Sequence, residues 1–363
     1  MTNKVENPDF AYHSPLLELV PDAAPAVSDN GLPPFMGVAW HYGNPLTEQR
    51  NFATGALVDR SHRTVLHVTG ADAPTFLHNL LSQKLDDVPD GFSASALNLD
   101  GQGRILHQAD MTKTGAEFYI DLPAADAATL LDYFQKMVFW SKVEFDQPDV
   151  GMLSVIGTDV TAPPATIVAR QLPFGPYQRQ DFVIPRAQLI DAATDLINQG
   201  AAPTGLMAYT AERVRAGIPE KDLDLDEKSI PHEVPGLINR GERIAAVHLE
   251  KGCYRGQETV ARVENLGRAP RLLVMLHLDG STPILPTPGT PITNKGRTVG
   301  RVGTVVHDHE YGPIALALVK RTALSSQSLL AGESAVLVDQ DSIPAEEQSQ
   351  AGRAAINRLK GLD

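Results

Sequence analysis

The residue with the most distinctive chemistry in this sequence is its single cysteine, Cys253. Gly252 and Gly256 flank it and allow the backbone to come close to a ligand or a partner. Lys251 and Arg255 add positive charge, which stabilises a thiolate and makes the sulfur more reactive. The alternative is that a free cysteine is a small buried apolar residue. The segment therefore predicts either a reactive thiol or an inert core residue.

The cysteine count also limits the kinds of site that the chain can build. One cysteine excludes an intrachain disulfide, and it excludes a zinc or iron–sulfur site made only of this chain's thiolates. A lone thiol is typical of a reducing compartment. Residues 1–10 lack the apolar stretch of a secretion signal, and no apolar run reaches membrane-spanning length. We therefore expect a cytoplasmic protein that does not contact membranes.

Composition indicates an ordinary globular protein. The chain has 363 residues, of which 42% are hydrophobic and 21% charged, and this length allows two or three domains. Its net charge of −13 repels phosphate backbones, so we expect no direct binding of nucleic acid.

Residues 46–268 are predicted to form an α+β region of two subdomains, because strands and helices alternate and some strands form antiparallel hairpins. Helices are expected from Asp72, and over 124–137, 186–198 and 209–216, whereas 257–263 fits a strand or a helix. Strands are expected over 56–59, 64–68, 93–99, 105–111, 117–122, 150–156 and 181–185. The turn Asp100–Arg104 joins two of these strands into a hairpin.

The two ends of the chain differ from this region. Residues 1–45 contain many prolines, which predicts an irregular or loosely packed segment. Residues 269–340 contain strands alone, expected at 271–278, 298–307 and 314–320, and indicate a small antiparallel barrel. Residues 341–363 are predicted to be a polar tail with a short helix.

The segment Lys251–Glu258 resembles the signature K-G-C-Y-x-G-Q-E of YgfZ-type proteins. Other segments resemble the wider family that includes the glycine-cleavage T protein. They are residues 57–61, 68–73 and 76–77 of the N-terminal pattern, the turn at 213–219, the P-x-E at 231–233 and the barrel strand at 300–304. The resemblance covers about residues 57–320.

This resemblance implies a fold and a function. The fold is α+β, a ring of three subdomains around a central channel, with antiparallel sheets plus helices and a small C-terminal β-barrel. The function is that of a monomeric tetrahydrofolate-binding protein. It supports the assembly or repair of iron–sulfur enzymes, including enzymes that modify tRNA, with client or assembly proteins as partners.

The resemblance also implies candidate site residues. Cys253 is the reactive thiol and Lys251 its cationic neighbour. No metal ligands are implied. The candidate tetrahydrofolate-binding residues are Asn98, Glu212, Arg215, Glu233, Tyr254, Gly256, Gln257 and Glu258.

Two departures from the T protein bear on the activity. His107 and Gln108 stand where that protein has paired aspartates, and methylene transfer needs a carboxylate to manage protons. His107 could act as a base, or it could be a strand residue with a packing role. We therefore expect no aminomethyltransferase activity of the T-protein kind. A folate-dependent one-carbon transferase or demethylase remains the alternative function.

The second departure concerns recognition of the pterin ring. Arg215 stands where the family has a glutamate that pairs with the pterin N–H donors. Arginine only donates, so Glu212 or Glu233 would have to supply the carboxylate.

Three further features have simple structural interpretations. The segment 307–310 contains possible metal ligands, but neighbouring strand residues point to opposite faces, so a solvated turn is expected. The segment 222–227 lacks the central glycine of a calcium loop and indicates an acidic surface loop. Trp40 and Trp140 could stack on a pterin, but core or subdomain packing is expected.

Overall fold

A five-stranded antiparallel sheet carries the glycine-rich hairpin. The computed structural model describes residues 12–26, 37–240, 244–282 and 284–343. The sheet order is β5 (Ser93–Leu99), β6 (Ile105–Thr114), β7 (Glu117–Leu122), β4 (Thr64–Thr69) and β8 (Glu144–Asp146). Two helices, α3 (Ala73–Leu80) and α4 (Ala124–Lys136), pack on it through apolar side chains such as Phe76 and Phe134.

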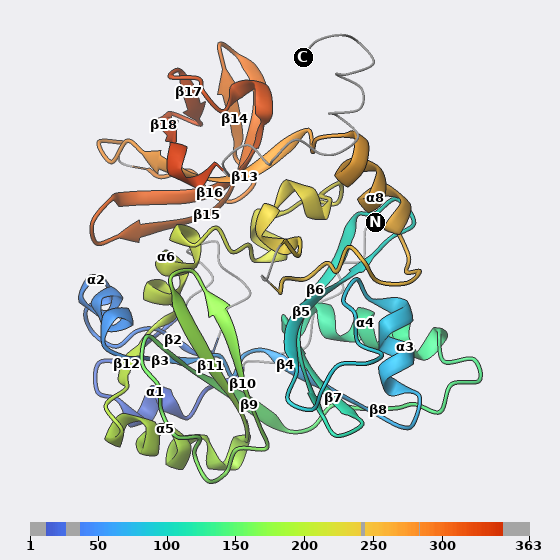
Figure 1. Ribbon diagram of the computed structural model, residues 1–363. Helices are drawn as coiled ribbons and strands as arrows, with labels where there is room; N and C mark the ends of the chain where they lie inside the picture. Colours follow the sequence, from blue (N-terminus) through green and yellow to red (C-terminus); the bar gives the residue numbers. More distant parts are fainter. Residues whose placement is uncertain (1–11, 27–36, 241–243, 283, 344–363) are drawn as a thin grey trace, which may run out of the picture.

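A second five-stranded sheet lies beside the first (Figure 1). Its order is β10 (Val168–Phe174), β11 (Tyr177–Pro185), β9 (Val150–Ile156), β3 (Ala56–Asp59) and β12 (Ala202–Thr204). β12 runs parallel to β3, and the other pairs are antiparallel. All residues of β9 are buried, and α5 (Leu189–Asn198) covers part of this sheet. β3 comes before the strands of the first sheet in the sequence, and the other strands of the second sheet come after them. The part of the molecule built on the second sheet, called the second body below, therefore consists of two separate stretches of the chain.

Buried ion pairs join the two sheets. Asp181 on β11 lies between Arg170 and Arg179, with Arg170 Nε at 2.8 Å and Arg179 Nε at 2.9 Å from its carboxylate oxygens. Across the sheets, Arg179 Nη2 lies 2.6 Å from Asp110 on β6, and Arg170 contacts Asp121 on β7. An unpaired buried charge is costly, so these contacts favour one arrangement of the two sheets.

The C-terminal body is a closed six-stranded barrel, orange to red in Figure 1. The order around the barrel is β13 (Arg271–Leu278), β16 (Gly312–Lys320), β15 (Arg297–Asp308), β14 (Pro291–Asn294), β17 (Leu329–Ala331) and β18 (Ser334–Val338). Arg213 anchors it to the helices α6 (Leu206–Arg215) and α7 (Lys221–Asp224). Its guanidinium lies 2.7 Å from Asp224 Oδ2 and donates to Thr304 Oγ1 on β15.

The N-terminal segment differs from its prediction. Its described part contains α1 (Leu16–Leu19), β1 (Ala24–Pro25), β2 (Ala39–His41) and the start of α2 (Pro45–Glu48), which leads into a 3-10 turn over 49–53. Leu16 and Val38 are buried in the core of the second body. The prediction for 1–45 was an irregular or loosely packed segment, and loose packing does not hold for this part, because these apolar side chains are buried even though turns and prolines separate the short elements. Residues 1–11 and 27–36 lie outside the described chain.

Most other elements match their predictions, and the α+β class and the barrel are confirmed. The helix expected over 209–216 begins earlier, at Leu206, and 186–188 form a 3-10 turn before α5. The segment after Gly256 is a helix, α8 (Gln257–Leu266). Of the predicted tail, residues 344–363 lie outside the described chain. Among the described helices, none has the length and apolar character needed to cross a membrane.

Several short elements were not predicted from the sequence. They include the strands β10, β14, β17 and β18. In β10 the buried positions include the charged Arg170, so the strand lacks the apolar alternation by which strands are recognised in a sequence. Trp140 also differs from its expected packing role. It is 90% exposed in the loop after α4 and packs in neither the core nor a subdomain contact.

Candidate functional site

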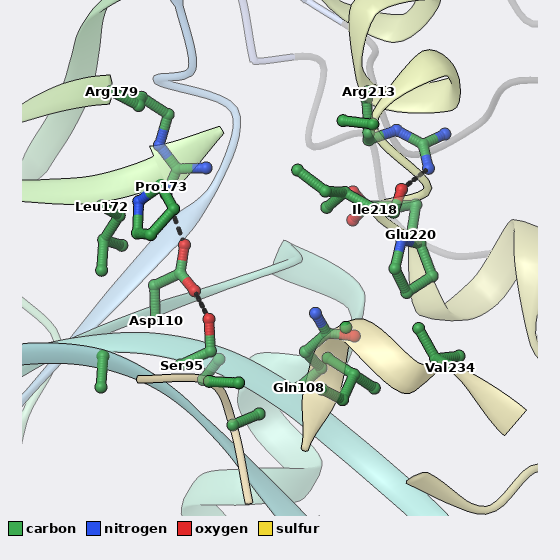
Figure 2. A pocket seen from close by; sticks show the side chains of 18 of the residues that line it. Ser95, Gln108, Asp110, Leu172, Pro173, Arg179, Arg213, Ile218, Glu220 and Val234 are labelled. Carbon is green, nitrogen blue, oxygen red and sulfur yellow. Dashed lines mark hydrogen bonds and ion pairs between the residues drawn. The ribbon is translucent and has the colours of Figure 1, made fainter. Parts of the chain in front are cut away.

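A cavity of about 740 Å³ lies where the two sheets meet α6 and the segment that follows it. Its described lining comes from the first sheet, the second sheet, α6 and residues 216–246, and none from the barrel. Figure 2 shows Asp110 and Ser95 on one side of this cavity, with Arg213, Ile218 and Glu220 on another. A cavity of this size suits a small-molecule ligand.

The lining is rich in cations, although the chain as a whole is acidic. Two carboxylates, Asp110 and Glu220, line the cavity. Five cationic side chains line it as well: Arg60, Arg63, Arg179, Arg213 and Lys221. All five are ion-paired, and most of their partners lie behind the lining: Arg60 and Arg179 pair with Asp181, Arg63 with Asp121, Arg213 with Asp224 and Lys221 with Asp126. An anionic ligand would therefore share cations that already have carboxylate partners.

Both lining carboxylates are engaged. Asp110 accepts a hydrogen bond from Ser95 Oγ at 2.5 Å and pairs with Arg179. Burial would raise the pKa of Asp110, but the guanidinium groups of Arg179, Arg170 and Arg60 hold it well below its usual range. Glu220 lies 3.6 Å from Arg63 Nη1. Neither group is available as a free base for proton transfer.

Another part of the lining is apolar. Leu172, Pro173, Ile218 and Val234 contribute aliphatic surface, and Tyr209 contributes an aromatic ring. The Tyr209 ring stacks on Phe174 with centroids 4.9 Å apart, which fixes its orientation. Such a wall suits the apolar part of a small ligand.

The side chains of His107 and Gln108 point in opposite directions from β6. Successive strand residues point to opposite faces, and β6 turns His107 toward α4, where its Nε2 lies 2.9 Å from Thr129 Oγ1. His107 Nδ1 faces the amide nitrogen of Asn98 at 3.1 Å. Gln108 instead lines the cavity, and its buried Oε1 has no hydrogen-bond partner in the described chain. Of the two positions where the T protein has aspartates, only the one occupied by the neutral amide of Gln108 faces the cavity.

None of the ten residues proposed from the sequence lines the cavity. Asn98 belongs to the buried pair with His107. Glu233 forms a two-pronged ion pair with Arg271 of β13, with distances of 2.7 and 2.8 Å. Both residues therefore stabilise packing, and a ligand contact for either of them stays a prediction.

Arg215 and Glu212 lie at the contact between α6 and the barrel. Arg215 Nη2 lies 2.9 Å from Glu310, and its guanidinium sits over the Tyr311 ring at 5.1 Å. It also lies 3.5 Å from Asp308, which anchors the turn between β15 and β16. The carboxylate of Glu212 is buried behind Gly175, a residue of the cavity wall, and burial raises its pKa.

Cys253 lies in a loop on the surface, away from the described cavity lining, and is exposed. The inert alternative required a buried cysteine and is wrong on that point. The Lys251 ammonium donates to the backbone carbonyls of His78 and Leu81 at the end of α3. Burial lowers the pKa of Lys251 to about 8. Tyr254 packs against the core, so the residues on both sides of Cys253 are fixed.

The last three signature residues shape the start of α8. Gly256 has a φ of 83°, and a Cβ there would lie 2.5 Å from the carbonyl oxygen of Asp100. Gln257 Oε1 accepts from the backbone N–H of Tyr254 at 3.1 Å. Glu258 adds negative charge to the first turn, where the helix dipole favours it. Figure 1 shows the segment before α8 passing over the ends of β5 and β6.

The cavity residues were missed in the sequence. Arg60 was noted only as part of a resembling segment, and Arg179, Tyr209 and Lys221 were assigned no role. One signal was present: Arg179 is two residues before Asp181, the first residue of the strand predicted over 181–185, and side chains two apart on a strand point to one face. The strand itself begins earlier, at Tyr177. The partner residues on β6 and β7 could not be found from spacing, because they come from the other sheet.

Comparison with known proteins supports the barrel and the fold. Residues 271–344 match the family model described as CAF17, C-terminal beta-barrel domain. The glycine cleavage system aminomethyltransferase T from Bartonella henselae superposes with a TM-score of 0.71 over 89% of this chain and 94% of that one, at 18% identity. The chain therefore has the T-protein fold, and the resemblance seen in the sequence is confirmed.

Curated relatives are distant. A putative chloroplastic transferase of Arabidopsis thaliana is 22% identical over 74% of this chain and 66% of its own length. The mitochondrial iron–sulfur cluster assembly factor IBA57 homolog of Mycosarcoma maydis is 27% identical over 64% of this chain and 60% of its own length. The tRNA-modifying protein YgfZ of Cronobacter sakazakii is 24% identical over 66% and 76%. The chain thus spans less than two thirds of the length of each of the first two relatives.

Proposed function

We propose that this chain is a tetrahydrofolate-binding accessory protein that supports the assembly or repair of iron–sulfur clusters in client enzymes. The observation that carries the proposal is the cavity between the two sheets and α6 of a T-protein fold, with an apolar wall and five arginine or lysine side chains in its lining. A reduced folate joins a flat heterocycle to a carboxylate-bearing tail, and the lining offers a counterpart to each.

Different residues of the cavity lining would bind different parts of the folate. The apolar wall around Tyr209 and Leu172 would hold the ring system. Carboxylates of the tail would bind Arg63 or Lys221 in place of Glu220 or Asp126, the partners of these two cations in the structure. The amide of Gln108 would donate to or accept from the ring edge, since one of its polar atoms is buried without a partner. The folate itself would supply a carrier for a one-carbon unit.

Binding is favoured over one-carbon transfer by the state of the lining carboxylates. Asp110 and Glu220 are both paired with arginines, and Gln108 cannot exchange a proton near neutral pH. His107 faces the helix layer and takes no part in the cavity. The transferase or demethylase alternative therefore lacks a free acid or base among the described lining residues.

The second part of the proposal is a role for Cys253 as a reactive thiol. Its loop is fixed by Lys251 and Tyr254 while the sulfur stays exposed, which suits exchange with another protein. The names of the IBA57 and YgfZ relatives support an iron–sulfur or tRNA-modification setting. We propose a cytoplasmic monomer whose partners are client or assembly proteins, with no direct contact to nucleic acid.

Calorimetric titration with tetrahydrofolate tests the cavity. The wild-type chain should bind one ligand per chain, and Gln108→Leu should weaken binding about tenfold through loss of one polar contact. Gln178→Leu is the matched control, since Gln178 is an exposed glutamine on β11 outside the cavity lining, and it should bind as the wild type does. Equal affinities of all three chains would place the ligand elsewhere.

The cellular role is tested with Cys253→Ser in a strain that lacks its own copy of the protein. Activities of iron–sulfur enzymes under oxidative stress should be restored by the wild-type chain and not by Cys253→Ser. Gly101→Ala, an open position in the hairpin turn, serves as a control for expression. Full restoration by Cys253→Ser would remove the thiol from the function.

A further inference from the structure

The segment between α4 and β8 carries two adjacent aromatic side chains at the surface. Trp140 is 90% exposed, more than any other large apolar side chain that the structure describes, and Phe139 is 75% exposed. Removing aromatic surface of this size from water is favourable, and tryptophan is enriched among the residues that dominate contacts between proteins. An adjacent pair left in water therefore indicates a contact with another molecule.

The residues on both sides of this pair are fixed. Val138 and Val143 pack against the core of the first sheet. The backbone N–H of Ser141 donates to the carbonyl oxygen of Val138 at 2.8 Å, which closes a turn over 138–141. The backbone N–H of Lys142 donates to Asp72 Oδ2 at 2.7 Å. The aromatic pair therefore projects from an anchored turn.

Phe139 has an unusual backbone conformation. Its φ is 45°, in the left-handed region that residues other than glycine rarely adopt. Such a conformation persists only where the surrounding structure holds it, and it occurs mainly at functional sites. A glycine at this position would remove the strain, so the aromatic side chain is present on a backbone that disfavours it.

The charged groups that flank this turn are mainly acidic. Residues 132–146 and the adjoining Asp72 include two cations, Lys136 and Lys142, and four carboxylates, Asp72, Asp132, Glu144 and Asp146. The flanks therefore carry a net negative charge. This charge repels anionic lipid headgroups, and it repels a second copy of this chain, whose net charge is −13. It is complementary to a basic partner.

We propose that the turn 138–141 is a docking site for a partner protein whose surface has an apolar pocket bordered by lysine or arginine. Phe139 and Trp140 would fill the pocket, and the carboxylates on the flanks would pair with its border. The buried aromatic anchors would supply most of the affinity, and the charges would set the rate and orientation of encounter. This inference deepens the proposed function, because it assigns a surface to the client or assembly proteins on which that function depends.

The docking site is separate from the other sites of the proposed function. Neither Phe139 nor Trp140 lines the cavity, and neither belongs to the loop that carries Cys253. Trp140→Ser removes a side chain that is almost fully exposed, so it should leave both folding and tetrahydrofolate binding unchanged. The variant therefore tests docking alone.

Photocrosslinking in cells tests the site, with benzoylphenylalanine in place of Trp140 in the full-length chain. Ultraviolet light should link the chain to another protein, and mass spectrometry of the linked peptide should place the link at an apolar residue with lysine or arginine beside it. Glu144→Lys together with Asp146→Lys should lower the yield of this adduct about tenfold, because two flanking carboxylates become cations. Benzoylphenylalanine in place of Ile284, which is 80% exposed between β13 and β14, is the matched control and should not give the adduct.

A cellular readout accompanies the crosslink. In the strain that lacks its own copy of the protein, Trp140→Ser should fail to restore the activities of iron–sulfur enzymes, and the matched Ile284→Ser should restore them. Full restoration by Trp140→Ser, a link only to lipid or to a second copy of the chain, no adduct, or an adduct whose yield is unchanged by the charge reversal would each overturn the proposal. A charge-dependent adduct in a strain where the wild-type chain restores no iron–sulfur enzyme would contradict the proposed function alone, so the two failures are distinguishable.

Discussion

His107 is held as a neutral imidazole between the first sheet and α4. Thr129 Oγ1 donates to the backbone carbonyl of Asp126, so it accepts from His107 Nε2. The amide nitrogen of Asn98 then donates to Nδ1. Burial, and next the charge of Lys221, lower the pKa of His107 to about 4. A residue that the sequence offered as a base is thus a packing residue.

This arrangement predicts a pH-dependent loss of stability. The pKa of His107 is about 4 in the folded chain and 6.5 as its usual value, so between these values the unfolded chain binds more protons. Stability therefore falls as the pH is lowered through this window. From pH 7 to pH 5 the loss due to His107 should be about 2 kcal/mol. Urea unfolding at both pH values should show this loss in the wild type and its absence in His107→Gln. The same pH dependence in both chains would contradict the assignment.

At the scale of elements, the hairpin turn of β5 and β6 packs on the start of α8. Gly103 and Gly256 both have positive φ, and their backbones face each other: a Cβ on Gly256 would lie 2.9 Å from Gly103 Cα. A Cβ on Gly103 would lie 2.8 Å from Thr259 Cβ. The glycines on both sides of this contact allow the cysteine loop to lie against the first sheet.

Substitution at this contact separates steric clash from backbone strain. Gly91→Ala changes a glycine with a φ of 78° and open space around it, and should cost about 1 kcal/mol of unfolding free energy. Gly256→Ala has a similar φ of 83° but meets the Asp100 carbonyl oxygen at 2.5 Å, and should cost about 2–4 kcal/mol. Urea unfolding of the two variants checks the difference. Equal losses would show that the contact does not constrain the loop.

At the scale of the whole molecule, local patterns predicted the elements better than their assembly. The apolar period over 124–137 and the strand-only pattern after 271 correctly indicated α4 and the barrel. They could not show that β3 pairs with β9 rather than with the neighbouring β4. The signature at 251–258 resembles that of YgfZ-type proteins, yet its residues shape a surface loop.

The central cavity could not be predicted because it depends on pairing between distant segments. Arg179 and Asp110 are far apart in the chain and meet only after both sheets form. Because side chains alternate along β6, Gln108 lines the cavity and His107 does not. The resemblance to the T protein drew attention to positions 107 and 108, and the fold places only Gln108 in the cavity lining.

We propose that the cavity holds a reduced folate without converting it. Equilibrium dialysis of the full-length chain against methylene-tetrahydrofolate, followed by chromatography of the bound ligand, tests this directly. We expect about one folate per chain, recovered unchanged because both lining carboxylates are ion-paired. No bound folate at millimolar ligand, or a folate recovered without its one-carbon unit, would contradict it.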